Sequence, residues 1–157
     1  MKEKTDKKKE PPLKGETESE PSMVIISQFI KDFSFENPNP GVLIGNSTIQ
    51  PTIDINFKVE VRSTSKDVYE VSLSTIIDAK QDKNRMFLLE LCYAGMFSLS
   101  NMDQEMLDMV SHVECPRMLF PFLRNIVANN TADGGFAPLY LSPINFLDFY
   151  NQHKQNK

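Results

Sequence analysis

The sequence predicts an α+β domain, in which a four-stranded antiparallel sheet comes first and helices pack on one face of it. Apolar and polar residues alternate over much of residues 24–100, as they do in half-buried strands. From residue 102 onward the apolar residues recur with the period of a helix instead. The connections between the second, third and fourth strands are short, which favours antiparallel pairing.

The four strands are expected at residues 24–36, 52–61, 68–79 and 86–100. The first is β-branched and aromatic and ends at the turn sequence NPNPG. The second alternates strictly and places Ile53, Ile55, Phe57, Val59 and Val61 on one face. A polar turn is expected at residues 80–85, between the third strand and the fourth.

Three helices should follow the sheet. The first is short and amphipathic, from Met102 to Val113, and Pro116 predicts a break before the second. The second continues to Asn130 and is ended by two adjacent glycines, 134 and 135. The last opens at Pro143.

Composition indicates one soluble domain of 157 residues, with 40% hydrophobic and 24% charged residues. Residues 1–22 are charged and poor in apolar side chains, so they are expected to be disordered; the domain then covers residues 23–153, and residues 154–157 form a flexible end. The net charge of −4 argues against nucleic acid and favours a basic partner. No apolar run is long enough to span a membrane, no signal peptide is seen at the start, and two cysteines make no disulfide framework. A cytosolic location is therefore expected.

Reactive residues do not form a convincing active site or metal site. His112 and Cys115 lie three residues apart, but the expected break at Pro116 would separate them. The spacing of Cys92, His112, Cys115 and His153 matches no compact zinc site. We therefore expect no catalytic residues, no metal and no cofactor; a small cysteine enzyme that uses Cys115 and His112 is the alternative from another class.

Carboxylates on two strands share one face of the expected sheet. Asp32 and Glu36 point away from the phenylalanines of the first strand, and Glu90 and Leu88 point away from the core side of the fourth. This face is either an ordinary solvated surface or a docking surface for a basic partner. The abundant apolar side chains likewise suit either a core or an interface, such as a groove for apolar peptides.

Six segments, in the same order along residues 24–152, resemble the bacterial protein-export chaperone family SecB. They are IKDFSFENPNP (30–40), IQPTIDINFKV (49–59), DVYEVSL (67–73), FLLELCYAGMFSL (87–99), CPRMLFPFLRNIV (115–127) and GGFAPLYLSPINF (134–146).

This resemblance implies a homotetramer, arranged as a dimer of dimers, that holds unfolded preproteins and passes them to the SecA motor ATPase. It implies neither catalysis nor a cofactor, nor insertion into the membrane. Matching positions would place the SecA contacts at Asp32, Glu36, Leu88 and Glu90. The client-binding residues would be Ile53, Ile55, Phe57, Phe122, Phe136 and Tyr150.

The chain also departs from the family pattern. Ile49 stands where many members have Trp, the charged N-terminal extension is long, and the C-terminus is mildly basic where many relatives are acidic. These departures concern the client groove and an auxiliary contact with SecA. A SecB-like chaperone dedicated to one antitoxin is the alternative within the same family.

Overall fold

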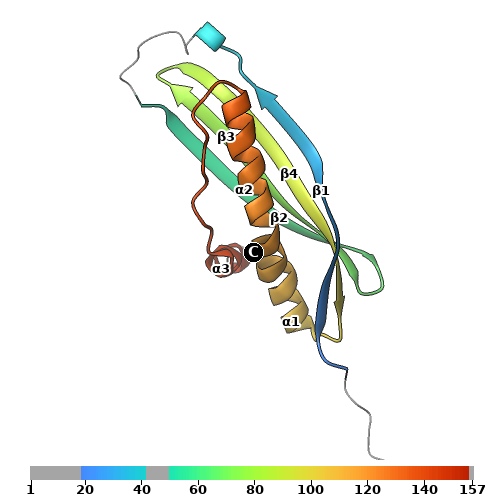
Figure 1. Ribbon diagram of the computed structural model, residues 1–157. Helices are drawn as coiled ribbons and strands as arrows, with labels where there is room; N and C mark the ends of the chain where they lie inside the picture. Colours follow the sequence, from blue (N-terminus) through green and yellow to red (C-terminus); the bar gives the residue numbers. More distant parts are fainter. Residues whose placement is uncertain (1–18, 42–49, 156–157) are drawn as a thin grey trace, which may run out of the picture.

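A four-stranded antiparallel sheet with helices on one face forms the body of the protein (Figure 1). The computed structural model describes residues 19–41 and 50–155. The strands are β1 (Ser22–Glu36), β2 (Thr52–Ser65), β3 (Val68–Gln81) and β4 (Asn84–Ser100). Their order is β1-β4-β3-β2, so β1 and β2 occupy the two edges and the first strand pairs with the last. The expected α+β architecture is confirmed, whereas Ile49 and residues 1–18 lie outside the described ranges.

The hairpin between β3 and β4 is tighter than expected. Pairing reaches Gln81 and Asn84, so only Asp82 and Lys83 remain between the strands. Asp82 has a φ of 55°, a left-handed conformation that aspartate tolerates better than most residues. The predicted polar turn at residues 80–85 therefore contributes most of its residues to the strands.

One continuous helical run follows the sheet, instead of two helices separated at Pro116. It consists of α1 (Gln104–Met109), a π-helical segment η2 (Val110–Glu114) and α2 (Cys115–Asp133). The predicted break is wrong because the N–H of Cys115 donates to the carbonyl of Val110, five residues earlier. This wider turn accommodates the proline that follows, which has no N–H to donate.

The last helix, α3 (Phe146–Gln155), begins three residues later than Pro143 because Asn145 caps it. The side chain of Asn145 accepts a hydrogen bond from the N–H of Asp148 at 3.3 Å. Among the described residues, no helix has the length and hydropathy that crossing a membrane requires.

The core lies between the sheet and α2, which Figure 1 shows running along β3 and β4. Alternate side chains of the two central strands fill it, together with one stripe of the helix. The fully buried members with the largest side chains are Phe97, Phe146, Leu73, Ile77, Leu89, Leu91, Leu119 and Leu123. The predicted core side of the fourth strand is confirmed.

Three phenylalanine rings close the end of the core where α2 stops. Phe87 lies 5.6 Å from Phe35 and 4.9 Å from Phe136, measured between ring centroids. Gly134 follows α2 directly, and a Cβ atom there would lie 2.4 Å from Cζ of Phe35. A glycine is therefore required at this position by close packing against β1.

We predict that Gly134→Ala lowers the free energy of unfolding by about 1–3 kcal/mol, because the added methyl group overpacks this ring cluster. Chemical denaturation followed by circular dichroism measures the change. Gly41→Ala is the matched control, because no atom lies within 4 Å of a Cβ placed there. Equal stability of Gly134→Ala and the parent would contradict the packing described.

Candidate functional site

The outer face of the sheet, opposite the helices, gathers the acids that the sequence singled out. In the pairing of β1 with β4, Asp32 is opposite Cys92, Ser34 is opposite Glu90, and Glu36 is opposite Leu88. Asp32, Glu36 and Glu90 are exposed and Leu88 is half-buried. Phe35, the residue before Glu36, packs against Phe87 and Phe136 on the helix side, so Glu36 points outward. The predicted juxtaposition of Asp32, Glu36, Leu88 and Glu90 is present.

We name this surface the acidic face, and β3 adds two residues to it that the sequence analysis missed. Ile76 pairs with Glu90 and Asp78 pairs with Leu88. Ile76 is 47% exposed, although the core side chains on either side of it along β3 are buried. The alternation of β3 already indicated that Ile76 lies on the face opposite the core. Only the pairing register, however, places Ile76 beside Glu90 and diagonal to Leu88.

The charge of Asp78 is neutralised within the acidic face. Arg85 donates two hydrogen bonds to its carboxylate, from Nε and Nη2, each at 2.9 Å, and Lys80 lies 3.0 Å away. The hydrogen bonds from Arg85 outweigh partial burial and lower the pKa of Asp78 to about 2. Asp32, Glu36 and Glu90 therefore remain to attract a partner, together with the exposed Asp54, which is opposite Asp78 on β2.

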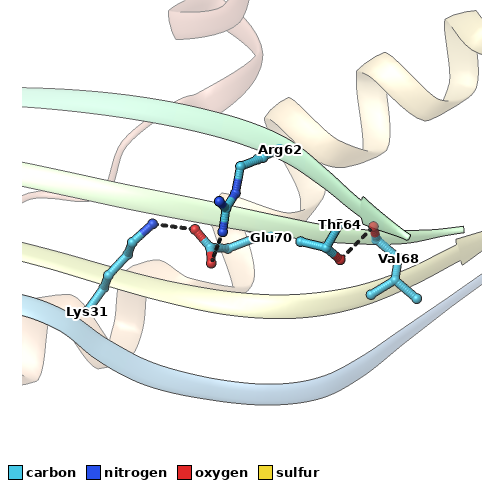
Figure 2. A network of polar contacts seen from close by, with 5 residues as sticks. All are labelled: Lys31, Arg62, Thr64, Val68 and Glu70. Carbon is cyan, nitrogen blue, oxygen red and sulfur yellow. Dashed lines mark hydrogen bonds and ion pairs between the residues drawn. The ribbon is translucent and has the colours of Figure 1, made fainter. Parts of the chain in front are cut away.

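Beyond the acidic face along the strands, Lys31 and Arg62 hold the carboxylate of Glu70 between them (Figure 2). A β-bulge between Ile30 and Asp32 turns Lys31 across β4, and its ammonium group forms an ion pair with Glu70 on β3. Arg62 of β2 reaches the other oxygen of Glu70 at 3.2 Å. The hydrogen bond from Lys31, the largest effect, keeps the pKa of Glu70 below its ordinary value although the side chain is only 11% exposed.

The helix side of β2 exposes apolar side chains that α2 does not cover. Ile53 and Ile55 are 36% and 38% exposed. Hydrogen bonds fix the segment between α2 and α3, residues 134–145, to α2, and two of them use side chains of the helix. Nε of Arg124 donates to the carbonyl of Leu141 at 2.8 Å, and the N–H of Leu139 donates to the hydroxyl of Thr131 at 2.9 Å. The segment is therefore held against α2, while Ile53 and Ile55 of β2 stay exposed.

The six predicted client-binding residues do not form one surface within a single chain. Phe57 packs towards α2 through Phe120, at 6.4 Å. Phe122 points to the other flank of the helix and stacks on Tyr93 at 5.9 Å. Phe136 belongs to the ring cluster at the end of the core, and Tyr150 packs on His112 at 5.3 Å. Ile53, Ile55 and Phe57 are consequently together, while Phe122 and Phe136 lie apart from them.

A hollow of about 590 Å³ opens between β2 and the helices near Tyr150. Its apolar lining comes from Val59 and Val61 on β2 and from Phe149 and Tyr150 on α3. Of these residues, only Tyr150 was predicted to bind a ligand. The strict alternation of β2 already placed Val59 and Val61 on the face of Ile53, but it did not show where α3 would lie.

Cys115 and His112 are not arranged for catalysis. The Cys115 thiol is fully buried against the sulfur of Met23 at 3.9 Å, and burial raises its pKa to about 12. Nδ1 of His112 instead lies 3.0 Å from the carbonyl of Asp108. Cys92 stands on the outer face of the sheet and Cys115 in the core, so the zinc ligands considered above are separated by the sheet.

We predict that Asp78→Asn lowers the free energy of unfolding by about 1 kcal/mol at pH 7, since it removes the paired carboxylate. Because folding depresses the pKa of Asp78 from 3.8 to about 2, its contribution is complete above pH 3.8 and is lost as pH falls towards 2. The difference between variant and parent should therefore vanish near pH 2. Urea titrations at several pH values test this, with Asp32→Asn, at an exposed position of β1, as control; a difference independent of pH would contradict it.

Comparisons with known proteins agree with this geometry. A family model described as "Preprotein translocase subunit SecB" matches residues 16–157. The chain is 42% identical over 135 residues to protein-export protein SecB of Parvibaculum lavamentivorans, covering 86% of this chain and 80% of the relative. It is 39% identical over 143 residues to the protein of the same name from Zymomonas mobilis, covering 91% and 87%.

A solved structure shares the fold at lower sequence identity. It is a SecB-like chaperone of Mycobacterium tuberculosis, in complex with a peptide from the HigA1 antitoxin. The TM-score is 0.65 and the identity 16%, with 78% of this chain and 90% of the other covered. Since the family model and the relatives span most of the sequence, this chain belongs to the SecB family of protein-export chaperones, which are not enzymes.

Proposed function

We propose that this protein holds unfolded preproteins in the cytosol and delivers them to the SecA motor ATPase. Membership of the SecB family supports the export role. The proposed binding of both SecA and clients rests on one observation: the two faces of the sheet differ in chemistry, one acidic and the other apolar. Asp32, Glu36, Leu88 and Glu90 lie on the outer face, whereas exposed apolar residues of β2 lie on the helix side.

The acidic face suits a basic partner with apolar side chains of its own. Exposed carboxylates steer a basic surface towards the sheet over a distance of about 10 Å at moderate ionic strength. Leu88 and Ile76 then supply a contact that excludes water between the charged groups. We assign SecA to this face, with Asp32, Glu36, Leu88 and Glu90 as its contacts.

The client surface would begin at Ile53, Ile55 and Phe57 and continue to Tyr150. The driving force is the burial of apolar area, at about 25 cal/mol for each Å² removed from water. β2 is an edge strand, so it also offers backbone groups to an extended segment. Each contact of this kind is weak, and several copies of the surface in one assembly would strengthen binding through avidity.

Self-association into a dimer of dimers is supported by the apolar character of β1. This edge strand exposes Val24, Ile26 and Ile30, an arrangement that isolated domains usually avoid because it invites pairing with another chain. Phe122, on the flank of α2 that faces Tyr93, is 49% exposed and suits the same interface better than the groove beside β2. We take residues 23–153 as the folded unit of this assembly.

We predict that Glu90→Lys weakens binding to SecA at least tenfold, because it places a cation at the centre of the acidic face. Surface plasmon resonance with immobilised SecA measures the affinity. Glu105→Lys, which makes the same change at an exposed position of α1, should bind as the parent does. Unchanged affinity of Glu90→Lys would show that SecA docks elsewhere.

We also predict that Ile30→Lys shifts the assembly from tetramer towards smaller species, because a lysine on an edge strand opposes pairing between strands. Native mass spectrometry reports the distribution. Ile76→Lys, on the acidic face and away from the edge, should keep the mass of the parent while losing affinity for SecA. A tetramer that survives Ile30→Lys would contradict the assigned interface.

A chaperone dedicated to one antitoxin is the second reading of the same fold. The peptide seen with the mycobacterial SecB-like chaperone motivates it, although the low identity makes that likeness one of fold alone. Capture of clients from a lysate of the source cell separates the readings. Many exported precursors support the export role, and one recurring client supports the dedicated role.

A further inference from the structure

Lys31 directly precedes Asp32 of the acidic face. In a regular strand, two such neighbours would point to opposite faces of the sheet. The β-bulge before Asp32 instead brings Lys31 to the outer face as well. There its ammonium group meets Glu70, which alternates on β3 with the fully buried Val71. The bulge therefore puts a cation within reach of a carboxylate that SecA is proposed to contact.

The ion pair with Glu70 turns Lys31 along the sheet, away from the acidic face. On β4, the positions opposite the acids of β1 extend from Leu88 to Cys92. Glu70 is opposite Met96, beyond Cys92 on the same strand. Figure 2 shows the side chain of Lys31 extending from β1 towards Glu70 on β3, and β4 lies between these two strands. The ammonium group is therefore held across β4, on the side that faces away from the acids.

Glu70 is fixed in place, whereas Lys31 has room to move. The side chain of Glu70 is only 11% exposed and that of Lys31 is 45% exposed. Arg62 binds the second carboxylate oxygen of Glu70 at 3.2 Å. Without the charge of Glu70, Lys31 is free to turn back and pair with Asp32. Arg62 is not, because it lies on the opposite edge strand, eight residues along β2 from Asp54.

We propose that Glu70 is a positioning residue for SecA binding, which holds Lys31 away from the acidic face and leaves Asp32 free to pair with a cation of SecA. A Lys31 released from Glu70 would neutralise Asp32, and SecA would have to displace it first. This inference rests on the proposed docking of SecA at the acidic face, and it adds a residue that acts through Lys31 without touching the partner.

Two double variants with the net charge of the parent test the proposal. Lys31→Gln, Glu70→Gln removes Lys31 together with its partner, whereas Arg62→Gln, Glu70→Gln removes the other cation and leaves Lys31 unheld. At low salt, we expect the first to bind SecA within about twofold of the parent and the second about three- to tenfold more weakly, because only the second leaves a free cation beside Asp32. Surface plasmon resonance with immobilised SecA measures both. Equal affinities of the two double variants would overturn the proposal.

The same pair of variants excludes a merely structural role of Glu70. Both lose the same carboxylate, so a loss of packing or stability at position 70 affects them alike. The difference between them should shrink at high salt, because salt screens exposed charges. A difference that persists in full at high salt would contradict the proposal.

The single variant Glu70→Gln covers the case in which Arg62→Gln, Glu70→Gln does not fold, as judged by circular dichroism. It also releases Lys31, and it should bind SecA about three- to tenfold more weakly than Lys31→Gln, Glu70→Gln does at low salt. Equal affinity of these two would overturn the assignment of Glu70 in the same way.

Glu90→Lys separates this proposal from the docking of SecA itself. If Glu90→Lys loses affinity for SecA while the two double variants bind alike, only the role of Glu70 is wrong. If Glu90→Lys binds SecA as the parent does, the assignment of SecA to the acidic face fails, whatever the double variants do.

Discussion

The alternation of core-facing and outward-facing side chains along β4 is the constraint on which the core and both surfaces of the sheet depend. Its odd-numbered side chains, from Phe87 to Leu99, fill the core beneath the helices, while Leu88, Glu90 and Cys92 stand on the opposite face. Because β4 pairs with β1 on one side and β3 on the other, its register aligns both neighbours. A slip of one residue would turn Glu90 into the core and Leu89 out to solvent.

This alternation allows a thin domain to present two chemically different surfaces. The acidic face keeps its charge because the nearby cations are already engaged: Arg85 with Asp78 and Lys31 with Glu70. The helix side exposes aliphatic and aromatic groups instead, along β2 and α3. A basic partner and an apolar client would therefore meet different faces of the same sheet, without competing for side chains.

Much of this arrangement could be predicted from the sequence, because strand periodicity is a local property. The alternation of residues 86–100 identified the core face of β4, and together with that of residues 24–36 it put Asp32, Glu36, Leu88 and Glu90 on one face of the expected sheet before any pairing was known. The non-local features were missed. The neighbour of Glu90 on β3, Ile76, follows from the register of the β3–β4 hairpin, which includes a shift between Ala79 and Lys80 that the expected turn at residues 80–85 did not indicate. The π-helical turn before Pro116 and the separation of Phe122 from Ile53 could not be predicted either, because both depend on how the helix lies on the sheet.

The central claim is that the two faces work independently, and a ternary complex tests it most directly. Native mass spectrometry of the assembly, loaded first with an unfolded preprotein and then titrated with SecA, would detect all three components together. The account predicts one species containing chaperone, client and SecA, with an affinity for SecA within about threefold of that for the empty chaperone. Displacement of the client by SecA in proportion to SecA bound, without a ternary species, would show that the partners share one surface and would contradict the account.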